Sequence, residues 1–128
     1  VVSALGAVVV VSVRGLQSGA PGVWYVGRAC RGWRASPLGN PFRVGRHGSR
    51  AVVIQRYRSW LWGVVQAGLA GQSSPAWGEL QSLARAVAAG QSVALGCWCA
   101  PLPCHASVVR SCVLWLVQQG HVPGVARG

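Results

Sequence analysis

The chain has 128 residues, a net charge of +11 and 52% hydrophobic residues. This length is enough for one domain with a single core, and the hydrophobic content excludes an intrinsically disordered chain. All twelve basic residues are arginines and Glu79 is the single acid, which excludes chemistry that needs paired carboxylates, such as glycoside hydrolysis and most magnesium-dependent phosphoryl transfer.

The positive charge favours anionic partners. Nucleotides, nucleic acid and acidic membrane surfaces are the general classes that such a basic protein attracts. The same composition, rich in arginine and free of lysine, is also typical of a GC-rich genome. The charge by itself therefore does not choose a partner.

The five cysteines indicate the redox setting of the protein. Their odd number and the close spacing of three of them are not those of a secreted disulfide scaffold, so we expect a reduced, cytoplasmic setting. At the N-terminus the first positive charge follows the apolar run, the reverse of a signal peptide. No segment reaches the roughly 18–20 apolar residues of a membrane span, so we expect no transmembrane segment.

Two short strands are expected in the first quarter of the chain. Residues 8–13 are a β-branched run ended by Arg14-Gly15, which predicts a buried strand. A Gly/Ser/Pro loop leads to a second strand over residues 23–26. Residues 29–48 show no periodicity and many Gly, Pro and Asn, which predicts a long ordered loop of the kind that serves functional sites.

The remaining elements are two helices, a strand and a third helix. Ser49 is the expected N-cap of a helix with apolar residues at helical spacing, and a second helix runs from about residue 77 to a stop at Gly90. A strand over 93–98 precedes a last helix over about 104–119. This order predicts one α/β domain, a small layered sandwich with a short, mainly parallel, Rossmann-like sheet. We expect the core over about residues 8–117 and a loose tail over 121–128.

Three cysteines and a histidine fall in the stretch GCWCAPLPCHA, residues 96–106. Residues two apart on a strand face the same side, so Cys97 and Cys99 are expected to point together. The prolines at 101 and 103 end the strand and place Cys104 and His105 in the first turn of the last helix. The end of a strand in an open α/β sheet is the usual place for ligands, so the group predicts a functional site.

Three interpretations of this group stay open. The first is a metal site, zinc or iron–sulfur, with Cys97, Cys99 and Cys104 as ligands, although the spacing departs from the C-x2-C pairs of common zinc modules. The second is a catalytic thiol at Cys104, with a pKa lowered by the helix N-terminus and with His105 as proton carrier. The third is structural, with small thiols packed where a strand turns into a helix.

Four segments carry a resemblance to a known family: WYVGRA (24–29), SPLGNPF (36–42), GSRAVVIQRYRSWL (48–61) and VALGCWCAPLPCHASVV (93–109). In this order the chain resembles, over about residues 8–117, the bacterial and phage family catalogued as domain of unknown function 4326. The resemblance implies a small cytoplasmic α/β domain and no established activity. The family usually carries an acid directly after CHA, where this chain has Ser107. If that acid is a base, a ligand or a partner for His105, this chain is a degenerate, inactive member. If the acid only caps the last helix, Ser107 can do the same.

The segment SPLGNPF of this family pattern predicts a rigid, turn-rich loop. Gly39 and Asn40 tolerate left-handed backbone conformations and offer backbone N–H groups. The functional interpretation is a phosphate or nucleotide pocket, with Arg28 as a fork donor and Ser36, Gly39 and Asn40 as ligand-binding residues, opposite the N-terminus of the last helix. The other interpretation is a scaffold loop held by its prolines.

Two functions of different classes follow. The leading hypothesis is an enzyme or binding domain for a nucleotide-like or phosphorylated ligand, held between Arg28, the 36–40 loop and the 97–105 turn. The alternative is a non-enzymatic nucleic-acid-binding domain with arginines on phosphates and a structural metal at the cysteines. For this alternative Trp33, between two arginines, is the candidate for an exposed base-stacking side chain.

Overall fold

The structure is a computed structural model that describes residues 5–99, 102 and 104–122. In chain order the elements are β1 (Val8–Ser12), β2 (Val23–Tyr25), α1 (Arg50–Leu69), α2 (Pro75–Ala88), β3 (Val93–Cys97) and α3 (His105–Gln118). The predicted α/β class is confirmed, because three helices accompany a small, wholly parallel sheet.

The sheet has the strand order β1-β3-β2, and β3 pairs in parallel with both neighbours. In this register Leu95 lies between Val10 of β1 and Trp24 of β2. Because all three strands run in the same direction, their C-terminal ends meet at one edge of the sheet. The segments that follow these strands are therefore brought together, which is the arrangement that creates ligand sites in open α/β sheets.

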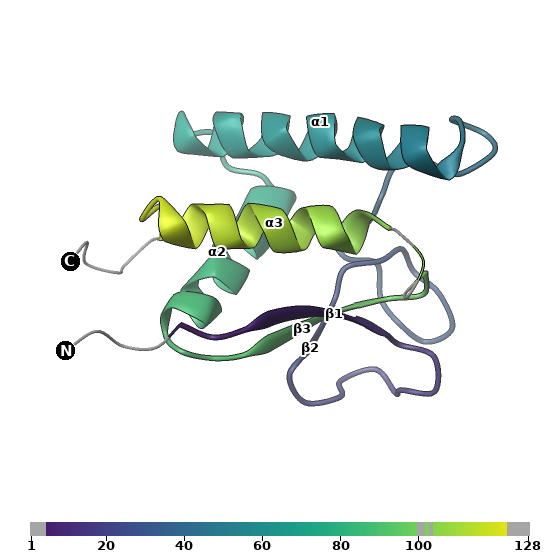
Figure 1. The fold of residues 1–128 in the computed structure, drawn as a ribbon, viewed down its shortest axis with the longest axis horizontal. Helices are drawn as coiled ribbons and strands as arrows, with labels where there is room; N and C mark the ends of the chain where they lie inside the picture. Colours follow the sequence, from purple (N-terminus) through teal and green to yellow (C-terminus); the bar gives the residue numbers. More distant parts are fainter. Residues whose placement is uncertain (1–4, 100–101, 103, 123–128) are drawn as a thin grey trace.

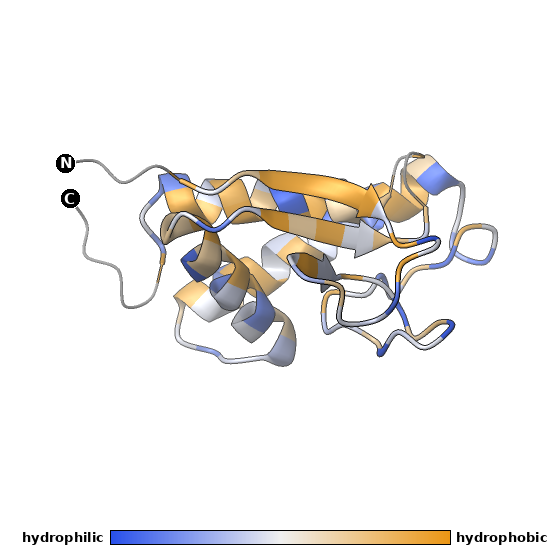
Figure 2. Cartoon of the chain, turned by 90° about the horizontal axis from the view of Figure 1, so that it is seen from below, coloured by the Kyte–Doolittle hydropathy of each residue, from blue (hydrophilic) through white to orange (hydrophobic). Residues whose placement is uncertain are grey.

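The described helices lie on one side of the sheet (Figure 1). α2 and α3 pack on the strands, and α1 packs on α2 and α3 as an outer layer. Figure 2, seen from below, shows the apolar strands on the side away from these helices. On this side Val9 is 49% exposed, so the strand predicted as buried is buried on one face only.

The core fills the space between the sheet and the three helices. Its largest fully buried side chains come from α1, α2, β3 and α3 and from the loop after β2: Leu38, Tyr57, Leu61, Leu80, Leu83, Leu95 and Leu116. Packing of α1 on α2 depends on Gly68, since a Cβ there would lie 2.2 Å from the Trp77 ring.

Helix starts follow the local sequence. The predicted N-cap at Ser49 is confirmed, because its hydroxyl accepts a hydrogen bond from the Val52 N–H. Ser74 caps α2 in the same way through the Trp77 N–H, and Pro75 occupies the first position of that helix. The Ser49 cap made the start of α1 predictable without knowledge of the packing, whereas the second helix, expected from about residue 77, begins at Pro75.

The packed chain continues beyond the predicted core. Val122 is only 8% exposed and belongs to the core, and the His121 N–H donates to the Leu116 carbonyl. The rest of the predicted loose tail, residues 123–128, lies outside the described residues. No helix in the part of the chain that the structure describes is long and apolar enough to cross a membrane.

Replacement of Gly96 in the central strand tests the packing of the sheet. A Cβ at Gly96 would lie 2.5 Å from Val13 Cγ1 and 3.0 Å from Val23 Cγ1. Val13 is fully buried and its short branched side chain cannot move aside. We expect Gly96→Ala to lower the free energy of unfolding by about 1–3 kcal/mol, measured by urea denaturation.

The matched control is Gly63→Ala on α1, where a Cβ meets nothing within 4 Å. This variant should stabilise the protein by about 0.5–1 kcal/mol, because alanine loses less backbone entropy than glycine in a helix. Equal effects of the two alanines would contradict the packing described around Gly96.

Candidate functional site

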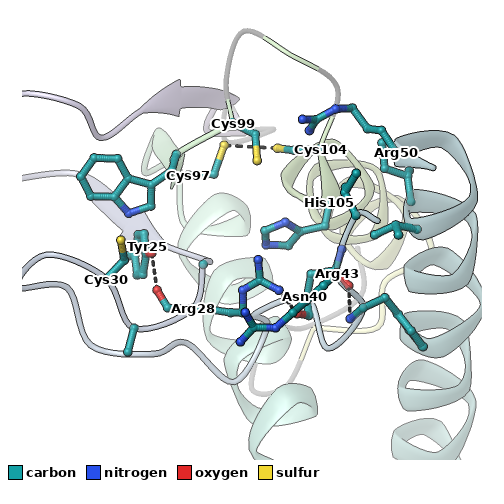
Figure 3. Close-up of a pocket in the computed structure, with 17 residues that line it drawn as sticks. Tyr25, Arg28, Cys30, Asn40, Arg43, Arg50, Cys97, Cys99, Cys104 and His105 are labelled. Carbon is teal, nitrogen blue, oxygen red and sulfur yellow. Dashed lines mark hydrogen bonds between the residues drawn. The ribbon is translucent and has the colours of Figure 1, made fainter. Parts of the chain in front are cut away.

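A cavity of about 370 Å³ opens at the C-terminal ends of β2 and β3. Its walls are the ends of these two strands, the loop segments 27–30 and 40–44, and the first turns of α1 and α3. Figure 3 shows polar and sulfur-bearing side chains facing this space from several elements. The cavity lies where the topology of a parallel sheet predicts a ligand site.

The cavity is electropositive. Arg28, Arg43 and Arg50 line it, and the described lining contains no acid. The N-terminal turns of α1 and α3 also line it, and helix N-termini favour negative charge. Glu79, the single acid of the chain, lies on α2 and outside this lining. The arrangement is therefore suited to an anion.

Two of the four predicted ligand-binding residues lie in the cavity wall. Arg28 Nη1 donates to the Asn40 carbonyl at 3.3 Å, which holds the guanidinium beside the cavity. The Asn40 side-chain Oδ1 accepts from the Phe42 N–H at 2.9 Å. Asn40 therefore shapes the loop and lines the cavity, and it leaves most of the guanidinium donors of Arg28 for other partners.

The other two, Ser36 and Gly39, are not among the cavity-lining residues. The Ser36 N–H donates to the Gly27 carbonyl, and the Gly39 N–H donates to the Ser36 carbonyl, both at 2.9 Å. The Ser36 hydroxyl accepts from the Leu38 N–H at 3.1 Å. These polar groups are used within the loop, so the structure supports the scaffold interpretation for this pair.

Gly39 and Asn40 tolerate left-handed backbone conformations but do not adopt them, since neither residue has a positive φ. Gly39 is needed for another reason. A Cβ there would lie 3.1 Å from the carbonyl oxygens of Gly27 and Ser36. The glycine lets the 36–40 loop pack directly against the backbone that follows β2.

Tyr57 of α1 holds the same loop from the other side. Its hydroxyl donates to the Leu38 carbonyl at 2.7 Å in a fully buried position. Burial raises the pKa of Tyr57 far above its ordinary value, so the phenol stays protonated and remains a donor. The loop is thus fixed relative to α1 by a buried hydrogen bond.

His105, the first residue of α3, connects this helix to the end of β2. Its Nε2 lies 2.5 Å from the Val26 carbonyl oxygen, and its ring packs edge-on against Tyr57 with centroids 5.0 Å apart. Because a carbonyl only accepts, Nε2 carries the proton, and Nδ1 is the basic nitrogen of the neutral ring. Burial lowers the pKa of His105, which favours this neutral form.

Three cysteines line the cavity at the junction of β3 and α3. The Cys97 and Cys104 sulfurs lie 3.2 Å apart, and the two residues are 1% and 4% exposed. The hydrogen bond with Cys97 and burial raise the pKa of Cys104, against a smaller lowering by the Ala106 N–H. This direction is opposite to the predicted one, because the two raising effects outweigh the helix N-terminus. A catalytic role of Cys104 stays a prediction.

The metal interpretation also stays a prediction. Cys97, Cys99 and Cys104 line the same cavity, but no three His, Cys, Asp or Glu side chains among the described residues are arranged to hold a metal ion. Cys112 is half-buried against the core, as its place on the apolar stripe of the last helix predicts.

The predicted exposure of Trp33 is wrong, because this side chain is only 6% exposed. Two hydrogen bonds between the backbones of Cys30 and Trp33 close a tight turn. The turn passes through Arg31 and Gly32, both with positive φ. It folds Trp33 back onto Tyr25, with ring centroids 5.0 Å apart. Trp33 therefore packs inside the domain and offers no stacking surface for a base.

Trp98 and Arg43 are among the cavity residues that the sequence pattern did not reveal. Trp98 lines the cavity and has the guanidinium carbons of Arg31 and Arg14 at 5.5 and 6.0 Å from its ring. Arg43 reaches the cavity from a loop without periodicity. The recurrence of arginine through residues 28–46 was the available signal, but it does not show which arginine turns inward.

Ser107 does not cap α3. The helix begins at His105, its N-cap is Cys104, and no side chain makes the capping hydrogen bond. Ser107 is the third helical residue, and its side chain is exposed and outside the cavity lining. The expectation that Ser107 replaces the family acid as a cap is therefore wrong.

The chain belongs to the family described as domain of unknown function (DUF4326), whose family model matches residues 13–115. This confirms the resemblance drawn from the four sequence segments. No curated protein and no solved structure matches the chain. The family match shows membership and assigns no activity, so the function has to be argued from the site.

Removal of the Tyr57 hydroxyl tests the buried link to the 36–40 loop. Tyr57→Phe leaves the Leu38 carbonyl without this donor, and we expect a loss of about 1–3 kcal/mol in the free energy of unfolding, measured by urea denaturation. The control is Tyr25→Phe, because the Tyr25 hydroxyl donates to the Arg28 carbonyl in an exposed position. A loss at Tyr25 as large as at Tyr57 would contradict the structural role given to Tyr57.

The lowered pKa of His105 predicts a pH dependence of stability. The unfolded histidine, with an ordinary pKa of 6.5, binds a proton at a higher pH than the folded one. The free energy of unfolding should therefore decrease as the pH falls from 6.5 toward the folded-state pKa. The decrease should be about 1.4 kcal/mol for each pH unit over which the two states differ in protonation.

His105→Gln is the comparison for this pH series, since glutamine can still donate to the Val26 carbonyl but does not titrate. Burial also raises the pKa of Glu79, which lowers stability as the pH rises through its own range, the opposite sign. Because both proteins contain Glu79, the difference between their urea-denaturation curves isolates His105. Identical pH profiles would show that His105 is not the cause.

Proposed function

We propose that this domain binds a small phosphorylated, nucleotide-like anion in the cavity at the ends of β2 and β3. One observation carries the proposal. Arg28, Arg43 and Arg50 converge with the first turns of two helices on one cavity whose described lining has no acid. Guanidinium groups and helix N-termini are the groups that bind phosphate most often in proteins.

The shape and chemistry of the walls support a ligand with an apolar part as well as a charged part. A volume of about 370 Å³ is within the range of small-molecule sites. Tyr25 and Trp98 provide aromatic surface, and Val53 and Ile54 provide aliphatic surface. A nucleotide combines these features, because the flat faces of its base stack on aromatic and aliphatic surface while its phosphates are anionic.

Catalysis at this site is a further part of the proposal. His105 keeps its proposed role as proton carrier, since its Nε2 is used by Val26 and Nδ1 holds the lone pair of the neutral ring. Cys104 is the weaker candidate for nucleophile, because a raised pKa reduces the thiolate fraction. A function of these cysteines is therefore more consistent with the raised pKa if it does not require a thiol that is deprotonated in the resting protein.

A nucleic-acid-binding function is the second candidate. The net charge of +11 favours it, and arginine contacts to phosphates would make such binding strongly dependent on salt. The burial of Trp33 removes the proposed stacking side chain. Three arginines, Arg28, Arg43 and Arg50, line one cavity, which favours a small ligand.

The direct test is calorimetric titration with adenosine diphosphate and, for comparison, adenosine. We expect the diphosphate to bind and adenosine to bind much more weakly. Arg43→Gln and Arg50→Gln should each weaken diphosphate binding by about 10- to 100-fold, the loss that corresponds to one charge-assisted hydrogen bond.

Arg85→Gln is the matched control, because it removes the same charge from an exposed position on α2 outside the cavity. An equal loss in Arg85→Gln would contradict a localised site. A single-stranded RNA oligonucleotide that binds with a steep salt dependence, and is weakened equally by all three variants, would support the nucleic-acid function instead.

A further inference from the structure

The closest approach of two thiols occurs at the floor of the cavity. Cys97 ends β3 and Cys104 is the N-cap of α3, and their sulfurs lie 3.2 Å apart. We propose that Cys97 and Cys104 are a redox-active dithiol that small anionic disulfides convert into an intramolecular disulfide. This function does not require Cys97 or Cys104 to be deprotonated in the reduced protein, and it uses the two cysteines as a pair.

The geometry makes the bond accessible with little movement. A disulfide bond is about 2.05 Å long, so the sulfurs need to approach by roughly 1 Å. The Cys104 side chain makes no full capping hydrogen bond to α3, and the contact of its thiol with the Ala106 N–H is the one helix interaction that rotation would change. The bond would join the end of the central strand to the start of the helix beside it.

Access to this buried pair comes through Cys99. Cys99 is only half-buried, it lines the cavity, and Figure 3 shows its sulfur beside those of Cys97 and Cys104. A thiol that is more exposed than its two partners is the natural first point of attack for a reagent that enters the cavity. We therefore assign Cys99 as the entry thiol.

The reaction is a series of thiol–disulfide exchanges that balances atoms and electrons. The Cys99 thiolate attacks a small disulfide RSSR, which forms a mixed disulfide and releases one RS⁻. Cys104, after it loses its proton, attacks the Cys99 sulfur and releases the second RS⁻. Cys97, also deprotonated, then attacks the Cys104 sulfur, and Cys99 leaves as a thiolate. Overall, two protein thiols are oxidised to a disulfide and RSSR is reduced to two RSH.

The preference for an anionic disulfide comes from the arginines of the cavity. The space through which the reagent reaches Cys99 is lined by Arg28, Arg43 and Arg50. Their positive charges repel a cationic reagent and attract an anionic one. This preference rests on the anion binding proposed above. The disulfide itself rests only on the position of the two sulfurs.

The bond is tested by oxidation of the folded protein followed by peptide mapping. Cleavage after Arg85 and Arg110 gives peptide 86–110, which contains Cys97, Cys99 and Cys104 together. In Cys99→Ser only the proposed pair remains in this peptide. After treatment with oxidised glutathione and alkylation of remaining thiols, we expect this peptide to be unalkylated and two hydrogen atoms lighter.

Two variants control this result. Cys99→Ser/Cys104→Ser has a single cysteine in the peptide and should show no internal disulfide, whereas Cys112→Ser should behave as wild type because Cys112 lies outside the cavity. Since Cys99→Ser retains both buried thiols, its folding should be intact, and circular dichroism checks this. A peptide of Cys99→Ser that stays reduced under excess oxidised glutathione overturns the assigned pair.

Rates test the entry thiol and the charge preference. Cys99→Ser should reach the same oxidised state more slowly than wild type, and equal rates would overturn the entry role of Cys99. Wild type should react with anionic oxidised glutathione about tenfold faster than with cationic cystamine, relative to their rates on the urea-unfolded chain. Equal relative rates would overturn the preference for an anionic disulfide but would leave the proposed Cys97–Cys104 disulfide unaffected. The adenosine diphosphate titration tests anion binding in the cavity separately.

Discussion

The hydrogen bond from His105 to the Val26 carbonyl is the contact on which the site depends. It joins the first residue of α3 to the backbone directly after β2. Against the same ring packs Tyr57 of α1, whose hydroxyl holds the Leu38 carbonyl. One imidazole and one phenol thus connect two helices, a strand end and a long loop, all of which contribute walls or supports to the cavity.

This buried junction explains how an irregular loop of about twenty residues can hold a defined shape. The loop has no periodicity of its own, and its order comes from a few buried polar contacts at its base. The Ser36 N–H donates to the Gly27 carbonyl after β2, the Gly39 N–H donates to the Ser36 carbonyl, and Arg28 donates to the Asn40 carbonyl. Because these donors and acceptors form hydrogen bonds with one another, the loop keeps a fixed shape. It can therefore place Arg43 at the cavity without a helix or strand to support it.

The near absence of acids has a local consequence at this cavity. In most proteins clustered arginines are partly neutralised by carboxylates, but the one acid of this chain lies on α2. The described lining of the cavity therefore holds three guanidinium groups and no carboxylate, and the Arg28 group donates to the Asn40 carbonyl. An anion that enters the cavity meets hydrogen-bond donors with no carboxylate beside them in this lining.

The arrangement of Cys97 and Cys104 depends partly on the local sequence and partly on long-range packing. β3 is followed closely along the chain by α3, so Cys97 and Cys104 lie in the same region, and this much follows from the order of residues along the chain. The distance of 3.2 Å between their sulfurs, and the raised pKa that this contact and burial produce at Cys104, depend on how the strand and helix pack. Thiols packed in this way are stable when reduced and close enough to be joined.

The amino-acid sequence by itself determined the elements, because each depends on local signals. A β-branched run formed β1, Ser49 capped α1, and apolar spacing marked the helices. The tertiary structure decided which loop residues face the cavity. A tight turn folded Trp33 inward, close packing used Gly39 and Ser36 as scaffold, and Arg43 and Trp98 turned toward the ligand space. The direction of a loop side chain, and the pKa of a buried thiol, are set by contacts with residues far away in the chain, and no local periodicity contains that information.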